Sequence, residues 1–348
     1  MRDIDKIRDA LTAASVRGER LVLATVMSVE GSVYRGAGAR MVVHADGKTL
    51  GAVSGGCLEA DVVARTPEVL AGGMPVLAHY DTRASDDVLL GLGMGCQGII
   101  ELLLEPLSGS SLQEAASFYA RLAAHRDDVT LFTLVQSAEG RPIGTRLLVD
   151  AAGNALEGDS ELLTLPEHVA REDIAPAIDL VVCGGGTDAI PLVALAREMG
   201  WRVTVVDHRA AFATVERFPR ADAVVCVNLT DENEKLGAHV LIDERTMAVV
   251  MAHSATHDRA YLHAMLAARA AYIGVLGPRR RTLELLGSVV KTGDDDIPST
   301  VHSPAGLDVG AETPEEIALS IVSEVAAVSR GRAGGMLRER RGPIHDRR

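Results

Sequence analysis

The chain has 348 residues, a length that fits two domains of about 100–200 residues each. Its formal net charge of −13 argues against surfaces that bind nucleic acid or anionic membranes. No apolar run reaches the ~20 residues that a bilayer span needs, and residues 1–6 lack the pattern of a signal peptide. We therefore expect a cytoplasmic protein that contacts neither nucleic acid nor membrane.

The four cysteines, Cys57, Cys96, Cys183 and Cys226, form no C-x-x-C pair, and a reducing cytosol disfavours disulfides between them. Cys183 and Cys226 lie within apolar runs typical of strands, where a cysteine serves as a small core residue. Cys57 and Cys96 each lie among glycines, so they are the two candidates for chemistry.

The first domain begins with apolar residues at helical spacing, at 4–16, and continues with a strand at 21–27. A loop then carries three glycines and two arginines, Arg35 and Arg40, between two strands. A hairpin is predicted next, because an Asp-Gly pair at 46–47 suits a tight turn between two apolar runs.

A predicted strand is followed by Gly55, Gly56 and Cys57, and a helix is predicted to start near Cys57. Free N–H groups at a helix N-terminus favour a thiolate, which is a nucleophile and a soft-metal ligand. Glu59 lies on the same turn and is a candidate base. Two plainer interpretations stay open: Cys57 fills space beneath the glycines, and Glu59 only complements the helix dipole.

A second glycine-rich turn at 92–98 contains Gly95 and Cys96, and its backbone can approach a ligand closely. The remaining elements of this domain are predicted as strands at 76–81, 99–104, 129–135 and 146–149 and an amphipathic helix at 111–124. Residues 153–177 are polar and contain two prolines. We interpret them as a linker, which gives a first domain of residues 1–152.

The second domain, residues 178–330, opens with an apolar run, three glycines and a run of helix formers. Gly184, Gly186 and Ala189 match the G-x-G-x-x-G/A fingerprint of a dinucleotide-binding turn. Gly184 permits the sharp turn, Gly186 lets N–H groups approach a phosphate, and the helix that follows Thr187 offers free N–H donors. The order of strand, turn, helix and strand predicts a Rossmann-like, doubly wound parallel sheet.

Asp207 ends the next strand, 23 residues after Gly184, close to the ~20 expected for an acidic residue that binds a ribose. The glycines can also serve only the turn, so nucleotide binding stays open. His253 and His257 follow a later strand at helical spacing, and we favour a strand-end histidine that faces the cleft over a metal pair. Arg279–Arg281 favour either an anion or a solvated turn, with equal weight.

A capped helix is predicted from Thr313, with Pro314 at its first position, and residues 331–348 form a basic tail. Along the whole chain, the ordered motifs resemble the XdhC/CoxI family of molybdenum-hydroxylase maturation factors. The motifs that carry this resemblance are 31–35, 38–41, 55–59, 93–98, the Gly184 turn, 257–258, 272–274, 279–281, 304–308 and 313–318. Tyr34 departs from the family, which often has proline at this position.

The resemblance implies an α/β protein whose mixed N-terminal domain precedes the Rossmann-like domain. It implies that the protein binds molybdenum cofactor (molybdopterin), supports its sulfuration by a cysteine desulfurase, and delivers it to an apo xanthine dehydrogenase or related hydroxylase, with a homodimer as one arrangement. On this interpretation Cys57 and Cys96 face the molybdenum, Arg35 and Arg40 pair with cofactor oxygens, and the Gly184 turn, Asp207 and His257 border a phosphate or nucleotide. Two alternatives remain: an NAD(P)-dependent oxidoreductase, and a protein-binding scaffold without a ligand.

Overall fold

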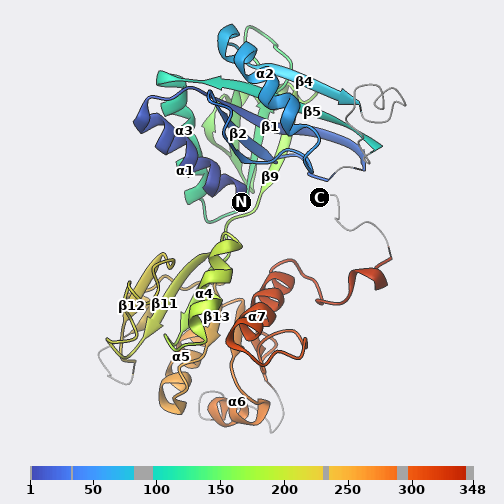
Figure 1. Ribbon diagram of the computed structural model, residues 1–348. Coiled ribbons are helices and arrows are strands. Elements are labelled where there is room, and N and C mark those ends of the chain that lie inside the picture. Colours follow the sequence, from blue (N-terminus) through green and yellow to red (C-terminus); the bar gives the residue numbers. More distant parts are fainter. Residues whose placement is uncertain (1, 33, 82–96, 230–234, 288–296, 342–348) are drawn as a thin grey trace. The chain divides into compact units, whose positions relative to one another are not determined.

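Figure 1 shows the computed structural model of the chain, which describes residues 2–32, 34–81, 97–229, 235–287 and 297–341. The chain divides into two compact units, Met1–Pro176 and Ala177–Arg348. Among the described residues, no helix combines the length and the apolar character needed to cross a membrane.

The first unit is built from antiparallel sheets and the helices that cover them. Its helices are α1 (Arg2–Arg17), α2 (Glu59–Gly72), α3 (Gly109–Ala124) and the 3-10 helix η2 (Ser160–Thr164). Its strands are β1 (Leu21–Ser32), β2 (Arg40–His44), β3 (Thr49–Gly51), β4 (Val76–Asp81), β5 (Gln97–Leu107), β6 (Val129–Leu134), β7 (Arg146–Asp150), β8 (Ala155–Gly158) and β9 (Val169–Ile174). One sheet has the order β3-β2-β1-β5-β4, and the other has the order β8-β7-β6-β9.

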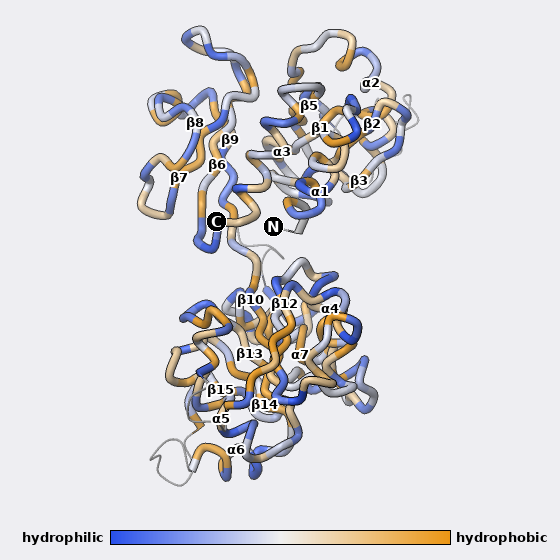
Figure 2. Tube along the Cα trace, turned by 90° about the vertical axis from the view of Figure 1, so that its left-hand side faces the viewer, coloured by the Kyte–Doolittle hydropathy of each residue, from blue (hydrophilic) through white to orange (hydrophobic). Residues whose placement is uncertain are grey.

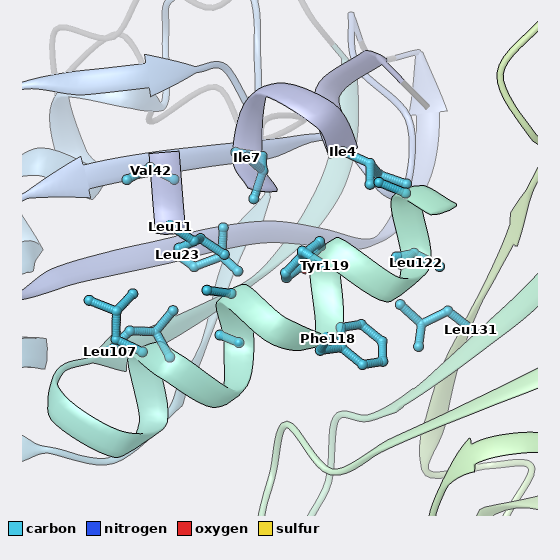
Figure 3. Close-up of a cluster of buried hydrophobic side chains, with 14 of the residues drawn as sticks. Ile4, Ile7, Leu11, Leu23, Val42, Leu107, Phe118, Tyr119, Leu122 and Leu131 are labelled. Atoms are coloured by element: carbon cyan, nitrogen blue, oxygen red, sulfur yellow. The ribbon is translucent and has the colours of Figure 1, made fainter. Parts of the chain in front are cut away.

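The alternation of side chains along β1 explains why helices cover both faces of the larger sheet. Leu21 and Leu23 are buried in one cluster with residues of α1 and α3, and that cluster also includes Leu131 of the smaller sheet (Figure 3). Val22 and Ala24 point to the opposite face, where α2 contributes buried side chains to a second cluster. The hydrophobic core around this sheet is therefore split into two layers, one on each face.

The predicted linker at 153–177 is wrong, because β8 and β9 lie within it and complete the smaller sheet. β9 pairs antiparallel with β6, with Val129 opposite Ile174. The sequence of β9 is Val-Ala-Arg-Glu-Asp-Ile, and three consecutive charged residues conceal the alternation that marks a strand.

One of those charged residues forms a buried ion pair that joins the two sheets. Arg40 of β2 is only 1% exposed, and its guanidinium binds both carboxylate oxygens of Glu172, at 3.0 and 2.5 Å. The same guanidinium donates to the Tyr119 hydroxyl at 3.0 Å and to the Gly38 carbonyl at 2.7 Å. Burial disfavours the charge, but Tyr119 and Glu172 raise the pKa of Arg40 above its usual range. The expectation that Arg40 binds a cofactor is therefore wrong, because internal partners take its donors.

The second unit is built on one parallel sheet with the order β12-β11-β10-β13-β14-β15. Numbered from the first strand of the unit this is 3-2-1-4-5-6, the order of a Rossmann fold, as the sequence predicts. The strands are β10 (Asp179–Cys183), β11 (Arg202–Asp207), β12 (Ala223–Cys226), β13 (Met247–Val250), β14 (Tyr272–Val275) and β15 (Val301–His302). The helices are α4 (Ala189–Glu198), α5 (Ala255–Ala267), α6 (Arg279–Leu286), α7 (Pro314–Val328) and the 3-10 helices η3 (Leu236–Ala238) and η4 (Leu337–Glu339).

Helices cover both faces of this sheet, so the central residues of its inner strands are mostly apolar (Figure 2). Leu180 and Val182 of β10 are buried in a cluster with α4 and α7. Val181 and Cys183 are buried in the cluster on the other face, which includes residues of α5 and α6. The carboxyl ends of β10 and β13, which are neighbours, form the point at which the strand order reverses and where such folds bind ligands.

We expect Arg40→Met to destabilise the first unit by about 3–5 kcal/mol, because Glu172 would keep a charge without its partner. Hydrogen exchange of peptides from β2 and β9 measures this loss, and peptides from β10 serve as an internal reference. Arg65→Met is the control: it breaks the exposed pair of Arg65 with Asp61, and such pairs contribute at most about 1 kcal/mol. Equal exchange in wild type and Arg40→Met would contradict this account.

Candidate functional site

A tight turn, residues 54–58, carries the candidate thiol of the first unit. The Ser54 hydroxyl oxygen is buried and accepts hydrogen bonds from the N–H groups of Gly56, Cys57 and Leu58, at 3.1–3.2 Å. Because three donors converge on one oxygen, this turn is well fixed. We call residues 54–58 the Cys57 turn. α2 begins only at Glu59, so Cys57 precedes the helix and does not lie within its first turn.

Glu59 holds the start of the Cys57 turn through hydrogen bonds. Its carboxylate accepts hydrogen bonds from the N–H groups of Val53 and Ser54, at 3.1 and 2.8 Å, and from the Ser54 hydroxyl, at 2.5 Å. Burial opposes the charge, but the hydrogen bonds from Ser54 outweigh it and lower the pKa of Glu59. Glu59 therefore serves as a structural acceptor for the turn, and its role as a candidate base stays a prediction. The role of Ser54 was not predicted. The pattern that could have indicated it is a serine followed by two glycines, with a glutamate five residues after the serine.

The structure places Tyr34 against the Cys57 turn and holds Arg35 at Ala52, which precedes the turn in the chain. The Arg35 Nε donates to the carbonyl of Ala52 at 3.1 Å. Next to it, Tyr34 contacts Gly55, where an added Cβ would lie 3.2 Å from the Tyr34 Cγ. Gly55 and Gly56 are exposed and Cys57 is half-buried, so the thiol borders solvent.

Gln97 and Gly98, the described residues of the glycine-rich motif at 92–98, begin β5 of the larger sheet. In the pairing of β1 with β5, Gly31 lies opposite Gly98 and Ser32 lies opposite Gln97. The end of β1, just before Tyr34 and Arg35, therefore lies beside the start of β5, and Tyr34 contacts the Cys57 turn at Gly55. Gly95 and Cys96 lie outside the described residues.

The Gly184 turn of the second unit is shaped by internal contacts. Gly184 has φ = 127°, and an added Cβ would lie 2.5 Å from the Met251 carbonyl oxygen. The Gly185 N–H donates to the Asp207 carboxylate at 2.7 Å. An added Cβ at Gly186 would meet only the His253 ring, at 3.8 Å. Gly184 is thus required for close packing, while Gly186 and the exposed Thr187 form the open side of the turn.

Asp207 does not offer its carboxylate to a ribose in this structure. Its side chain is fully buried and also accepts from the Arg209 N–H at 2.8 Å and from the Arg209 guanidinium at 2.9 and 2.7 Å. Burial opposes ionisation, but Arg209 and the Gly185 N–H lower the pKa of Asp207. The predicted ribose ligand is therefore an internal acceptor that fixes the Gly184 turn.

His257 lies in the first turn of α5 and contacts several polar groups near the strand ends. Its ring stacks on that of His208, with centroids 3.5 Å apart and an angle of 12°. Its Nδ1 lies 2.9 Å from the Ser254 hydroxyl, and its Nε2 lies 3.2 Å from the Asn228 side-chain oxygen. His253, in the preceding loop, lies 3.4 Å from the Asp188 carboxylate. Within the described part of the chain, no group of three or more His, Cys, Asp or Glu side chains could hold a metal ion.

Several motifs of the second unit serve to hold the fold together. The buried Asp258 accepts from the Arg281 guanidinium and from the Ala252 N–H, so Arg281 forms an internal ion pair. On α7, Glu324 accepts from the Tyr272 hydroxyl at 2.6 Å and from the Gly306 N–H at 2.7 Å. The anion that we considered for Arg279–Arg281 is therefore not needed to balance Arg281.

The two remaining cysteines differ in exposure. Cys183 is buried in β10, as predicted, and burial raises the pKa of its thiol. Cys226 is exposed, contrary to expectation, because β12 is the edge strand of the sheet. An open hollow of about 840 Å³ in the first unit is lined by α3, β7 and β8 but contains none of the predicted site residues.

Fold and site together define a two-unit protein that joins an antiparallel α+β domain with a glycine-flanked thiol to a Rossmann domain. The profile of the XdhC and CoxI family matches residues 14–81, and that of the XdhC Rossmann domain matches residues 180–325. A protein of Bacillus subtilis that is named as a probable subunit of xanthine dehydrogenase is 34% identical over 88% of this chain and 92% of the relative. This chain belongs to the XdhC and CoxI family.

Two further matches cover most of the chain. The molybdenum cofactor insertion chaperone PaoD of Escherichia coli is 24% identical over 90% of this chain and 85% of the relative. The crystal structure of a xanthine dehydrogenase from Bacillus halodurans has a TM-score of 0.79 and 29% identity, and the match covers 95% of this chain and 97% of that one.

We expect Gly184→Ala to destabilise the second unit by at least about 1–3 kcal/mol, because its positive φ is strained for alanine and its Cβ would clash with Met251. Gly186→Ala is the matched control and should change stability little. Thermal unfolding followed by the fluorescence of Trp201, which is buried in this unit, compares them. Equal losses in both variants would contradict the distinct roles of the two glycines.

His208 predicts a pH dependence of stability. Burial lowers its pKa below 6.5, the His257 ring and Arg209 add to this shift, and Asp207 and Asp258 oppose it. The folded state therefore disfavours the protonated ring, and stability present above pH 6.5 is lost as the pH falls below it. We expect His208→Gln to lose less stability than wild type between about pH 7 and 5, measured by denaturant unfolding. His263→Gln, on the exposed side of α5, should follow the wild-type profile.

Proposed function

We propose that this protein binds molybdenum cofactor, supports its sulfuration and delivers it to an apo molybdenum hydroxylase such as xanthine dehydrogenase. The observation that carries the proposal is the half-buried thiol of Cys57 on a fixed, glycine-flanked turn, with Arg35 held at Ala52 just before that turn. The names of the relatives support it, since one is a probable component of xanthine dehydrogenase and the other is a molybdenum cofactor insertion chaperone.

The chemistry of the Cys57 turn suits this cargo. A thiolate is a soft donor, and soft donors suit the metal end of a dithiolene-bound molybdenum centre. Gly55 and Gly56 have no side chains and are exposed, so a bulky ligand can approach the sulfur. A guanidinium such as that of Arg35 pairs well with phosphate and ring oxygens.

Cys96 stays the predicted second thiol of the site. It precedes Gln97 in the chain, and Gln97 pairs with Ser32 close to the motif that contains Arg35. The place of its described neighbour Gln97 supports the proposal that Cys96 acts together with Cys57. With its neighbour Gly95, it completes the site that we propose in the first unit.

In the second unit we propose that Gly186, Thr187 and His257 border a phosphate or nucleotide portion of the ligand. The saturated carboxylate of Asp207 counts against the alternative of an NAD(P)-dependent oxidoreductase, because that activity needs a ribose acceptor at this place. A cysteine desulfurase as sulfur donor, a homodimer and a cytoplasmic location belong to the same proposal.

We expect Cys57→Ser to stay folded and to lose retention of molybdenum cofactor by at least about tenfold, because an oxygen is a poor substitute for a soft sulfur ligand. Metal analysis of freshly purified protein and fluorescence of the oxidised pterin measure this loss, and reconstitution of an apo hydroxylase measures delivery. Cys226→Ser removes an exposed thiol of the second unit and is the matched control.

If Cys57→Ser and Cys96→Ser together retain molybdenum and activate the hydroxylase like wild type, the proposed thiol role is wrong. If purified wild type binds NAD(H) or NADP(H) and turns over a substrate alone, the oxidoreductase alternative replaces it.

A further inference from the structure

Tyr34 is the most unusual aromatic side chain of this protein. The chain has ten Phe, Tyr and Trp residues, and all of them lie within the described residues. Nine are buried or half-buried, whereas Tyr34 is 76% exposed. Rings of this size supply much of the buried area in ordinary cores. Packing within the chain therefore does not explain the position of Tyr34.

The position of this ring is defined by the Cys57 turn. Tyr34 contacts Gly55, where an added Cβ would lie 3.2 Å from the Tyr34 Cγ and 3.4 Å from its Cδ1. Glycine therefore allows the ring to approach the backbone of the turn closely. On one side, Arg35 is attached to the Ala52 carbonyl. Cys57 follows Gly55 by two residues, so the ring contacts the turn that carries the thiol, and Arg35 is held at Ala52 just before that turn.

The turn beneath the ring is rigid. Ser54 gathers three N–H groups of the turn, and Glu59 in turn binds Ser54. An aromatic ring that rests on such a support presents a surface with little entropy left to lose on binding, since tyrosine has only two side-chain torsions. The ring rests on the glycine backbone of the turn, which differs from the broad apolar core of a protein interface.

We propose that Tyr34 is the stacking surface for the planar pterin ring of the cofactor and thereby determines which ring systems the Cys57 turn accepts. The inference rests on the proposed function, because it assigns one part of the same ligand. Planar heteroaromatic rings stack on tyrosine faces in an offset arrangement. Three chemically different parts of the cargo then have separate partners: sulfur for the metal, the guanidinium for oxygens, and Tyr34 for the ring.

The test uses the full chain and pterin-6-carboxylate, a fluorescent pterin without metal. Tyr34→Leu removes the ring and keeps an apolar side chain, and it should weaken binding roughly 5- to 150-fold, the range of one stacked base on an aromatic residue. Tyr34→Phe keeps the ring and should bind within about twofold of wild type. Met74→Ala, at a side chain of the same unit that is 62% exposed, is the control for the loss of surface apolar area.

Cys57→Ser separates this inference from the proposed function, because a probe without metal does not need the thiol. We expect this variant to bind pterin-6-carboxylate like wild type while it loses molybdenum. The stacking role is overturned if wild type does not bind the probe, or if Tyr34→Leu binds it as tightly as wild type. It is equally overturned if Tyr34→Leu retains pterin and fails only in activating the hydroxylase, which would make Tyr34 a contact to the protein partner. The thiol role fails independently, if Cys57→Ser retains molybdenum.

Discussion

The first unit depends on the buried guanidinium of Arg40. It binds Glu172 from a strand 132 residues later, and it also binds Tyr119 of α3. Removing one partner of such a pair leaves the other charge without compensation in the interior, which costs more free energy than replacing both partners by apolar residues. Arg40 also binds the Gly38 carbonyl, and so fixes the end of the loop that begins at Tyr34 and Arg35. The contact that joins the sheets therefore also limits where the candidate ligand residues can lie.

A common principle links the two glycine turns. Glycine turns expose backbone N–H groups, and these must find acceptors when they are close to the core. In the first unit, the Ser54 hydroxyl and the Glu59 carboxylate satisfy them. In the second unit, the Asp207 carboxylate accepts from Gly185. The positions of Glu59 and Asp207 in the sequence suggest a functional role, but in the structure both carboxylates accept hydrogen bonds from the backbone of the turns. What remains for a ligand is the outer side of each turn, at Gly55–Cys57 and at Gly186–Thr187.

Predictions that rest on local physics agree with the structure. The fingerprint at Gly184, followed by alternating strands and helices, predicts a parallel sheet, because a crossover between parallel strands has few alternatives. Thr313 and Glu316 cap α7 through reciprocal hydrogen bonds, and Pro314 occupies its first position, as the sequence predicts. The hairpin of β2 and β3 turns at Gly47 with φ = 84°. In each of these cases the residues that determine the structure are close together in the chain.

The sequence by itself determined the Rossmann order, the apolar strands and the family to which the chain belongs, since these depend on short motifs and on periodicity. Only the tertiary structure decided which charged residues face inward. The sequence around Arg40, Glu59 and Asp207 does not show whether each side chain binds a ligand or another residue of the chain. Their partners are a distant strand, a serine five residues back and a glycine on an adjacent strand end. A charge takes its role from the acceptors and donors that folding brings to it, and a pairing across 132 residues, such as that of Arg40 with Glu172, leaves no local pattern.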